Sequence, residues 1–339
     1  MKKIFFIPLL LLATACSKSD TTVENDSQIR FDLGFSGQTR VMANAFESGD
    51  VTGLYMTEYD GSNKPTPLLA SGNAVNNAAL RFDGTSWTSS PTLFWDKGVK
   101  YDVYGYYPYA NPSSVEEYRF SVATDQTTSK TAESLGGYEA SDFLWAKQTG
   151  VKYPDVVRLT FSHRMSRLVV NLVKGKDFEG DLPKDVVVKV HGTVTDAIVD
   201  LGSGTVVKDS HGKAESITMK KEIDSVFSSI IVPQRIDNRQ PLVEVLTSNV
   251  SYLMESRFVF RSGVQHSINI ILDSDPAKVK IEIGGEIQGW NYTPPGADAP
   301  FPHPNKLKSI FPGARCHHLH PGMFFVCSMP IPKPCGSLL

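Results

Sequence analysis

Hydrophobic residues recur at every second position in almost every patterned segment of this chain, as they do in half-buried β-strands. The segments are short, rich in Val, Ile, Tyr and Phe, and bounded by Gly, Pro, Asn and Asp. They cover residues 51–55, 99–107, 158–161, 168–173, 186–190, 229–232, 242–247, 267–272 and 279–283. No long segment has apolar residues at helical spacing. The pattern predicts an all-β fold of antiparallel sandwiches or barrels with little helix.

The length of the chain suits two domains of ordinary size. The first, residues 29–158, is rich in Tyr and Trp, and the second, residues 159–297, is richer in aliphatic strands. No cysteine occurs between Cys16 and Cys316. We therefore expect buried apolar side chains, and not disulfides, to hold this part of the chain together.

The first residues are typical of an export signal. A basic start is followed by an apolar run, residues 4–12, that is too short to span a membrane as a helix. Small residues then precede Cys16, as in a bacterial lipoprotein cleavage site; the alternative is an ordinary signal peptide in which Cys16 has no role. We predict a lipoprotein signal peptide over residues 1–16, a lipid on Cys16, and a polar tether over residues 17–28.

Residues 29–35 are predicted to form the first strand, with one apolar face made by Ile29, Phe31, Leu33 and Phe35. Burying four such side chains at about 1.5–3 kcal/mol each contributes about 6–12 kcal/mol, comparable with the stability of a whole domain. A polar loop ending at Arg40 follows. A cut there would release residues 29–40 and leave a groove that a strand of another chain could fill. The alternative is an ordinary first strand and a solvent-exposed Arg40.

Aromatic residues gather between Trp87 and Tyr109. Tyr side chains occupy both faces of the predicted strand over residues 99–107, which favours a strand packed on two sides over a flat platform for sugar rings. A surface that binds glycans through exposed aromatic residues, at Trp87, Trp95 or Trp145, is the alternative.

The sequence contains no G-x-S-x-G, H-E-x-x-H or P-loop motif. His163 has no ligand or carboxylate at motif spacing, so we predict a structural histidine that hydrogen-bonds between strands. The net charge is −2 and no basic stripe appears, which argues against nucleic acid as a partner. We predict that the protein is not an enzyme and has no catalytic residue, cofactor or metal.

Several short motifs follow one another along the chain. They lie at residues 39–40 (TR), 46–54 (FESGDVTGL), 93–95 (LFW), 101–109 (YDVYGYYPY), 141–146 (SDFLWA), 159–166 (LTFSHRMS) and 287–290 (IQGW). This ordered set, behind a lipoprotein signal, resembles the fimbrillin family. Its members are lipoprotein-exported pilins and pilus-accessory proteins of certain anaerobic Gram-negative bacteria.

The resemblance implies two tandem transthyretin-like β-sandwich domains and export to the outer membrane and cell surface. It implies a structural subunit of a fimbrium, or pilus, that contributes to adhesion. In polymerising members it also implies an Arg-directed maturation protease and strand exchange with other pilus subunits. Arg40 would be the cleavage site, residues 29–35 the removed strand and Cys16 the lipidated residue that reaches the outer membrane. Anchor and tip members of the family can keep their first strand. The stalk, anchor and tip roles are therefore all alternatives for this chain.

The chain departs from the family pattern near its end. Family members usually stop soon after the Gly-Trp strand, whereas this chain continues to residue 339. Residues 298–339 form a tail rich in Pro, Cys and His, with Cys316, Cys327 and Cys335 at spacings that match no familiar zinc module. We predict a disordered tail.

Overall fold

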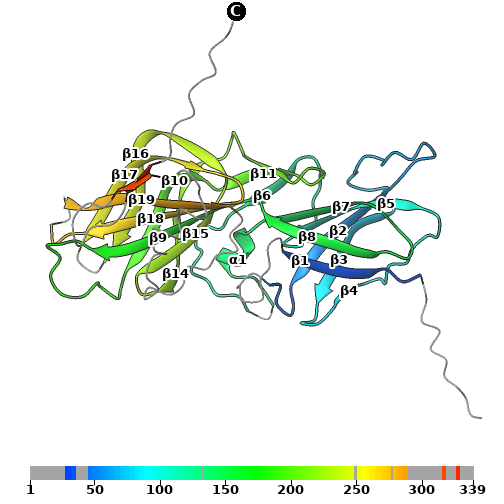
Figure 1. Cartoon of the computed structure of the whole chain (residues 1–339), viewed down its shortest axis with the longest axis horizontal. Helices are drawn as coiled ribbons and strands as arrows, with labels where there is room; N and C mark the ends of the chain where they lie inside the picture. Colours follow the sequence, from blue (N-terminus) through cyan, green and yellow to red (C-terminus); the bar gives the residue numbers. More distant parts are fainter. Residues whose placement is uncertain are drawn as a thin grey trace, which may run out of the picture. The chain divides into compact units, whose positions relative to one another are not determined.

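The computed structural model describes residues 27–35, 45–131, 133–247, 250–275, 278–288, 315–317 and 326–328. The chain divides into two compact units, Met1–Asn291 and Tyr292–Leu339. The prediction of an all-β fold with little helix is confirmed (Figure 1): α1 (Gly137–Ser141) is the only α-helix in the described ranges.

Nineteen strands belong to the first unit. They are β1 (Arg30–Phe35), β2 (Val51–Glu58), β3 (Val75–Phe82), β4 (Trp87–Ser89), β5 (Lys100–Tyr107), β6 (Tyr118–Ser121), β7 (Leu144–Lys152), β8 (Val156–His163), β9 (Ser166–Lys174), β10 (Val187–Val194), β11 (Asp196–Asp200), β12 (Thr205–Lys208), β13 (Ala214–Thr218), β14 (Lys220–Ile223), β15 (Val226–Ile231), β16 (Gln234–Leu246), β17 (Ser251–Phe260), β18 (Val264–Leu272) and β19 (Lys280–Gln288).

The first sheet has seven strands in the order β1-β8-β7-β5-β2-β3-β4. It curls so far that its two margins, β1 and β4, come into contact. β1 runs parallel to β8, and the other neighbours are antiparallel. The curl encloses a hydrophobic core to which most of the strands contribute: Ile29, Leu33, Leu54, Met56, Leu80, Trp87, Trp95, Tyr101, Val103, Tyr107, Leu144, Ala146, Val151, Val157, Leu159 and Phe161. We call these residues the inner core.

β5 is buried on both faces, as its sequence predicts. Tyr101 and Tyr107 belong to the inner core, whereas Tyr104 and Tyr106 face a second core on the outside of the curled sheet. There the ring of Tyr106 lies 6.1 Å from that of Tyr118 on β6. β6 forms a three-stranded sheet with β11 and β12, so that this small sheet covers the outer face of the curled one.

Two structural links cross the predicted domain boundary at residue 158. β8 runs over that residue, and only Arg164 and Met165 separate β8 from β9. In addition β11, which follows β10 in the sequence, pairs antiparallel with β6 of the first half. The division into residues 29–158 and 159–297 stays a prediction.

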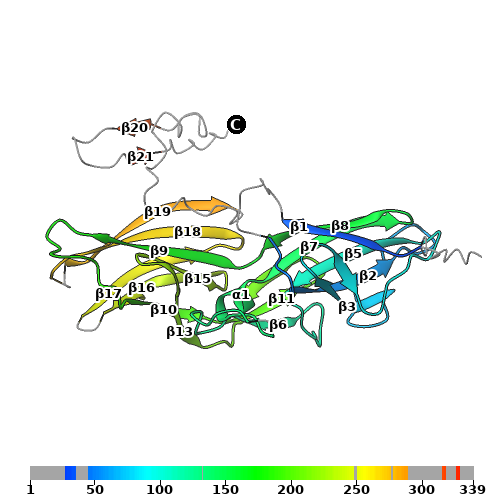
Figure 2. The same cartoon turned by 90° about the horizontal axis from the view of Figure 1, so that it is seen from below.

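The second half of this unit is a β-sandwich. Figure 2 shows β17, β16, β10 and β13 side by side, in a four-stranded sheet that faces a five-stranded sheet of order β14-β15-β9-β18-β19. Fully buried aliphatic side chains fill the space between the two sheets, among them Leu168, Val170, Val188, Ile268 and Ile270. These residues alternate along their strands because successive side chains of a strand point to opposite faces.

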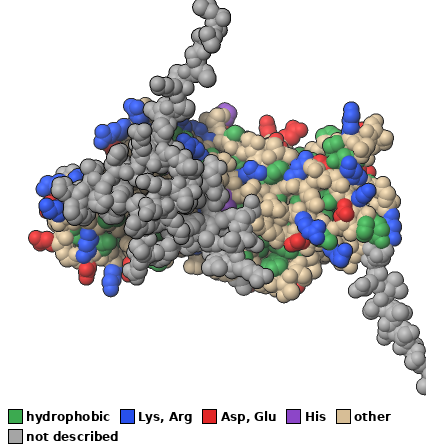
Figure 3. Space-filling model, in the orientation of Figure 1, with side chains coloured by type: hydrophobic (Ala, Val, Ile, Leu, Met, Phe, Trp, Pro, Cys, Tyr) green, Lys and Arg blue, Asp and Glu red, His purple; other side chains and the backbone are tan. Residues whose placement is uncertain are grey.

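In the second unit, β20 (Arg315–His317) pairs antiparallel with β21 (Val326–Ser328). Both lie in the tail for which disorder is predicted; the rest of residues 298–339 lies outside the described residues, as do the signal peptide and Cys16. Within the described part of the chain, no helix is long and apolar enough to cross a membrane. On the face drawn in Figure 3, basic and acidic side chains are interspersed.

A candidate strand-exchange site

β1 places its apolar face in the inner core. Ile29 is 4% exposed and Leu33 is 9% exposed, while Phe31 and Phe35 are half-buried. Two and not four of these side chains are fully buried, so the free energy of about 6–12 kcal/mol expected from burying all four is an overestimate. Ile29 and Leu33 alone contribute about 3–6 kcal/mol, and the two Phe rings add less than their full value.

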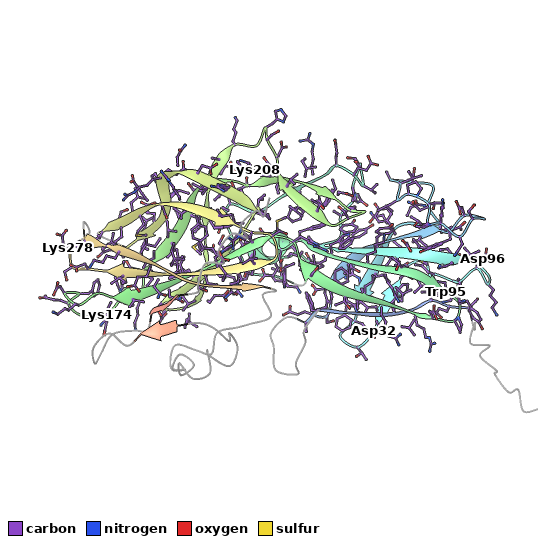
Figure 4. All side chains as sticks on the ribbon, turned by 45° about the horizontal axis from the view of Figure 1, so that its top comes forward. Asp32, Trp95, Asp96, Lys174, Lys208 and Lys278 are labelled. Carbon is purple, nitrogen blue, oxygen red and sulfur yellow. The ribbon has the colours of Figure 1, made fainter. Side chains whose placement is uncertain are left out.

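The backbone of β1 is bonded along one margin, and the residues just before it are bonded on the other side. On one side its residues pair with Val156–Phe161 of β8. On the other side, the residues just before it meet the segment 93–95: the Ile29 N–H donates to the Leu93 carbonyl at 2.9 Å, and the Trp95 N–H donates to the Ser27 carbonyl at 2.7 Å. Figure 4 labels Asp32 on β1 and Trp95 on that segment. β1 is thus the strand that closes the curled sheet.

An aromatic cluster surrounds the end of β1. The Phe35 ring lies 4.8 Å from that of Phe46, which in turn lies 4.8 Å from Trp87 and 5.4 Å from Phe161. Phe35 also stacks on His163 at 5.8 Å. Residues 36–44, which include Arg40, lie between Phe35 and Phe46 in sequence and outside the described residues. Phe46 therefore keeps contacts with Trp87 and Phe161 that do not depend on β1.

His163 is buried and hydrogen-bonded, but its partner lies outside the strands, so the predicted bond between strands is not the one found. Its side chain is 6% exposed, and its Nδ1 lies 2.9 Å from the Asp142 Oδ1. The pair joins the end of β8 to the residue that follows α1.

The chain that enters β2 is held by a buried carboxylate. Asp50, with a side chain only 7% exposed, accepts from Lys130 Nζ at 2.8 Å and from the Glu47 N–H at 2.8 Å. Lys130 also lies 2.9 Å from the Glu47 carboxylate. Partial burial disfavours the charged ammonium, but the hydrogen bonds to Asp50 and Glu47 outweigh it and raise the pKa of Lys130. These contacts fix residues 47–50 independently of β1.

β19 is a weakly buried strand of the second half. It bonds only to β18, at the margin of its sheet. Ile283 is 67% exposed, and Ile281 is half-buried. The register between β18 and β19 shifts near Ser267, where Gly284 and Gly285 lie in the opposite strand. Few apolar contacts hold this strand in its own sheet.

The aromatic side chains form core and not a sugar platform. Trp87 and Trp95 are 9% and 5% exposed, and the Tyr residues of β5 are buried. Trp145 is half-buried; its indole N–H donates to the Leu201 carbonyl at 2.7 Å, and the Arg164 guanidinium lies 4.7 Å from its ring. None of the three Trp residues presents a free ring face, which the glycan-binding alternative requires. Among the described residues, Phe94, at 49% exposure, and Tyr109, at 36%, are the large aromatic rings left open to solvent.

The contact between the residues before β1 and the segment 93–95 was not predicted from the sequence. The apolar residues Leu93, Phe94 and Trp95 are a visible signal, but the bonds involve backbone groups of residues far apart in the sequence. Within the described ranges, no three His, Cys, Asp or Glu side chains gather as metal ligands.

Comparison with known proteins gives a family and a fold. A sequence model described as fimbrillin-like matches residues 39–290. No curated protein matches the chain. Among solved structures, a Bacteroides ovatus protein provisionally assigned to cell adhesion superposes with a TM-score of 0.58 at 18% identity, over 79% of this chain and 98% of its own. A Bacteroides uniformis protein with the same provisional assignment gives 0.58 at 16% identity, over 77% and 97%.

A third structure, the tip fimbrial protein Mfa3 from Porphyromonas gingivalis, gives a TM-score of 0.44 at 8% identity, over 72% of this chain and 95% of its own. At identities this low, the two Bacteroides structures show a shared fold. The family match spans most of the chain, from just before Arg40 to the end of the predicted Gly-Trp strand. This chain belongs to the fimbrillin-like family.

Proposed function

We propose that this protein is a structural subunit of a bacterial surface pilus, exported as a lipoprotein through Cys16 and contributing to adhesion. In the proposed assembly, an Arg-directed protease cuts at Arg40 and releases β1, and a strand of a neighbouring subunit takes its place beside β8. The outer membrane and fimbrium are the proposed locations. The observation that carries the proposal is that β1, the strand just before Arg40, closes the curled sheet.

The geometry supports the release of β1 without loss of the remaining fold. β1 is the first strand, so a cut after it leaves the other strands on one continuous chain. Residues 47–50 stay fixed through Lys130, and Phe46 stays packed on Trp87. The opened groove would expose the backbone of β8 together with inner-core side chains such as Leu159, which favours addition of another strand.

β19 is the proposed donor strand. Ile281, Ile283 and Ile287 occupy alternate positions in it, with Gly285 between the last two, which matches the spacing of the apolar face of β1. Its limited burial lowers the cost of leaving its own sheet. In a neighbouring subunit, Ile281 and Ile283 would take two of the four places that Ile29, Leu33 and the two Phe residues occupy here.

Limited digestion with an Arg-specific protease tests the proposal on the chain without residues 1–16. We expect one early cut, at Arg40, followed by release of the β1 fragment and growth of ordered oligomers, measured by intact mass and size-exclusion chromatography. Arg40→Ala should stay intact and monomeric. Arg30→Ala is the matched control, because Arg30 is an exposed arginine inside β1 and its loss should change nothing. Resistance at Arg40, or a cut chain that stays a stable monomer, would remove the polymerising role.

Lipid attachment is tested separately. In an expressing bacterium, the full chain should partition with the outer membrane, and Cys16→Ala should release it into the soluble fraction. Equal partitioning of the two would exclude an anchor at Cys16, whatever the fate of Arg40.

A further inference from the structure

Three side chains form a hydrogen-bonded row on the outer face of the four-stranded sheet. They are Ser216 on β13, His191 on β10 and Glu244 on β16, and these strands are neighbours in that order. The Ser216 Oγ lies 2.7 Å from the His191 Nδ1, and the His191 Nε2 lies 3.0 Å from the Glu244 Oε2. The serine and the carboxylate are thus hydrogen-bonded to the two different nitrogens of one imidazole ring.

A β-bulge puts the imidazole in this position. The register between β10 and β13 shifts between Val190 and Thr193, and Gly192, inside the bulge, has a φ of +70°. This left-handed backbone angle calls for glycine, because any other side chain would be strained there. Bulges commonly redirect a side chain beside a functional site.

The charge of Glu244 fixes the tautomer of His191. Hydrogen bonds from Ser251, at 2.7 Å, and from His191 hold the pKa of Glu244 below its ordinary value, so the carboxylate only accepts. Neutral His191 must therefore carry its proton on Nε2 and donate it to Glu244. The lone pair of Nδ1 then faces Ser216, and the serine O–H donates to it.

This is the arrangement of a nucleophile, a base within hydrogen-bond reach and a third group that orients the base. Ser216 is exposed, so a substrate can reach its Oγ, whereas the side chains of His191 and Glu244 are only 22% and 21% exposed. We propose, against the sequence-based prediction of no catalytic residue, that Ser216 and His191 are catalytic residues for the hydrolysis of small carboxylic esters at this sheet face, with Glu244 as a positioning residue.

The proposed chemistry conserves every atom. The Ser216 Oγ attacks the ester carbonyl carbon while the His191 Nδ1 takes its proton. The proton passes to the departing alkoxide, which leaves as the alcohol, and an acyl-serine remains. Water then attacks the acyl carbon with the same nitrogen as base, and a carboxylic acid leaves as Ser216 regains its proton.

The chain supplies a matched control. Ser210 lies 3.2 Å from the His211 Nδ1, and the Asp209 Oδ1 lies 3.5 Å from that same nitrogen. Because both partners face one ring nitrogen, this pair cannot hold the imidazole as a base toward the serine. His211 is also fully open to solvent, with 94% of its side chain exposed.

The test uses the full chain with two probes, a fluorophosphonate that labels activated serines and p-nitrophenyl acetate as the ester. Peptide mass spectrometry should place the label on Ser216 and not on Ser210. His191→Gln should slow labelling and ester hydrolysis by roughly 10²-fold, the usual contribution of a general base. Ser216→Ala should abolish both, and Ser210→Ala should change neither.

Glu244→Gln separates a positioning role from a merely structural one. Without the carboxylate, the positive charge that forms on His191 during the attack loses its stabilising partner, so kcat should drop while KM stays unchanged. Unfolding curves should show that each variant is folded at the assay temperature. Labelling of Ser216 no faster than of Ser210, or a rate unchanged by His191→Gln in a folded variant, would overturn the proposal. None of these readouts depends on cleavage at Arg40 or on pilus assembly.

Discussion

Leu33 should determine how firmly β1 stays in place once the chain is cut between residues 36 and 44, at Arg40 or at an introduced protease site. The Leu33 side chain lies in the inner core, and its backbone pairs with Leu159. Replacing a buried Leu by Ala costs about 2–5 kcal/mol, through lost burial and the cavity left behind. Because about 1.4 kcal/mol corresponds to a tenfold change, Leu33→Ala should weaken retention of β1 about 30- to 4,000-fold.

The assay follows a fluorophore attached to the tether, and measures how fast the cut fragment leaves the remaining chain. Asp32→Ala is the control, because the Asp32 side chain is 69% exposed and its pair with Arg158, at 3.6 Å, is solvent-exposed. Such a pair contributes about 0–1 kcal/mol, so release should change by about fivefold at most. Equal release from the Leu33 and Asp32 variants would refute the reasoning that the apolar face retains β1.

Three further predictions concern the unfolding free energy, measured by urea titration. Gly53→Ala should lower it by about 1–3 kcal/mol or more, because the new Cβ would lie 2.0 Å from the ring of Tyr106. Gly61→Ala is the control, because its new Cβ meets nothing within 4 Å. Equal urea midpoints for the two variants would contradict the tight packing at Gly53. Asp102→Ala should lower the unfolding free energy by about 1–3 kcal/mol, since it leaves the part-buried Gly150 N–H, 3.0 Å from the Asp102 Oδ1, without its acceptor. A loss below about 1 kcal/mol would show that this carboxylate is not needed. Burial lowers the pKa of His266 in the fold. The unfolded imidazole therefore takes up a proton at about pH 6.5 that the buried one resists, so the unfolding free energy should fall as the pH drops below that value. His266→Gln should flatten this fall, and an unchanged slope would contradict the role of His266.

Alternating sequence patterns predicted the strands that pack on a core from one or two sides. β5 is the clearest case, because Tyr on both faces of the segment correctly indicated burial on both. The pattern missed β3, whose sequence VNNAALRF carries two Asn residues and little alternation. It also missed β17, although Tyr252, Met254, Phe258 and Phe260 do alternate there and could have revealed it.

Local sequence patterns did not predict which distant segments pair with each other. Nothing in residues 196–199 indicates that they pair with residues 118–121, and nothing near Ser27 indicates its bond to Trp95. Such contacts depend on how the whole sheet curls. The Ser216, His191 and Glu244 row is similar, because its members come from three strands and one of them is positioned by a bulge. Conversely, the apolar face of β1 and its place before Arg40 were evident from the sequence.

The parallel pairing of β1 with β8 has a mechanical consequence for whatever strand occupies that position. A pull along the strand axis loads all the interstrand hydrogen bonds from Arg30 to Phe35 together, in shear, whereas a pull across the sheet would open them one after another. Only Arg164 and Met165 separate β8 from β9, so tension taken up by β8 passes directly into the sandwich of the second half. A fibre built by strand replacement at β8 would therefore carry tension along the strands of each subunit. At each junction, the interstrand hydrogen bonds at β8 would break all together and not one by one.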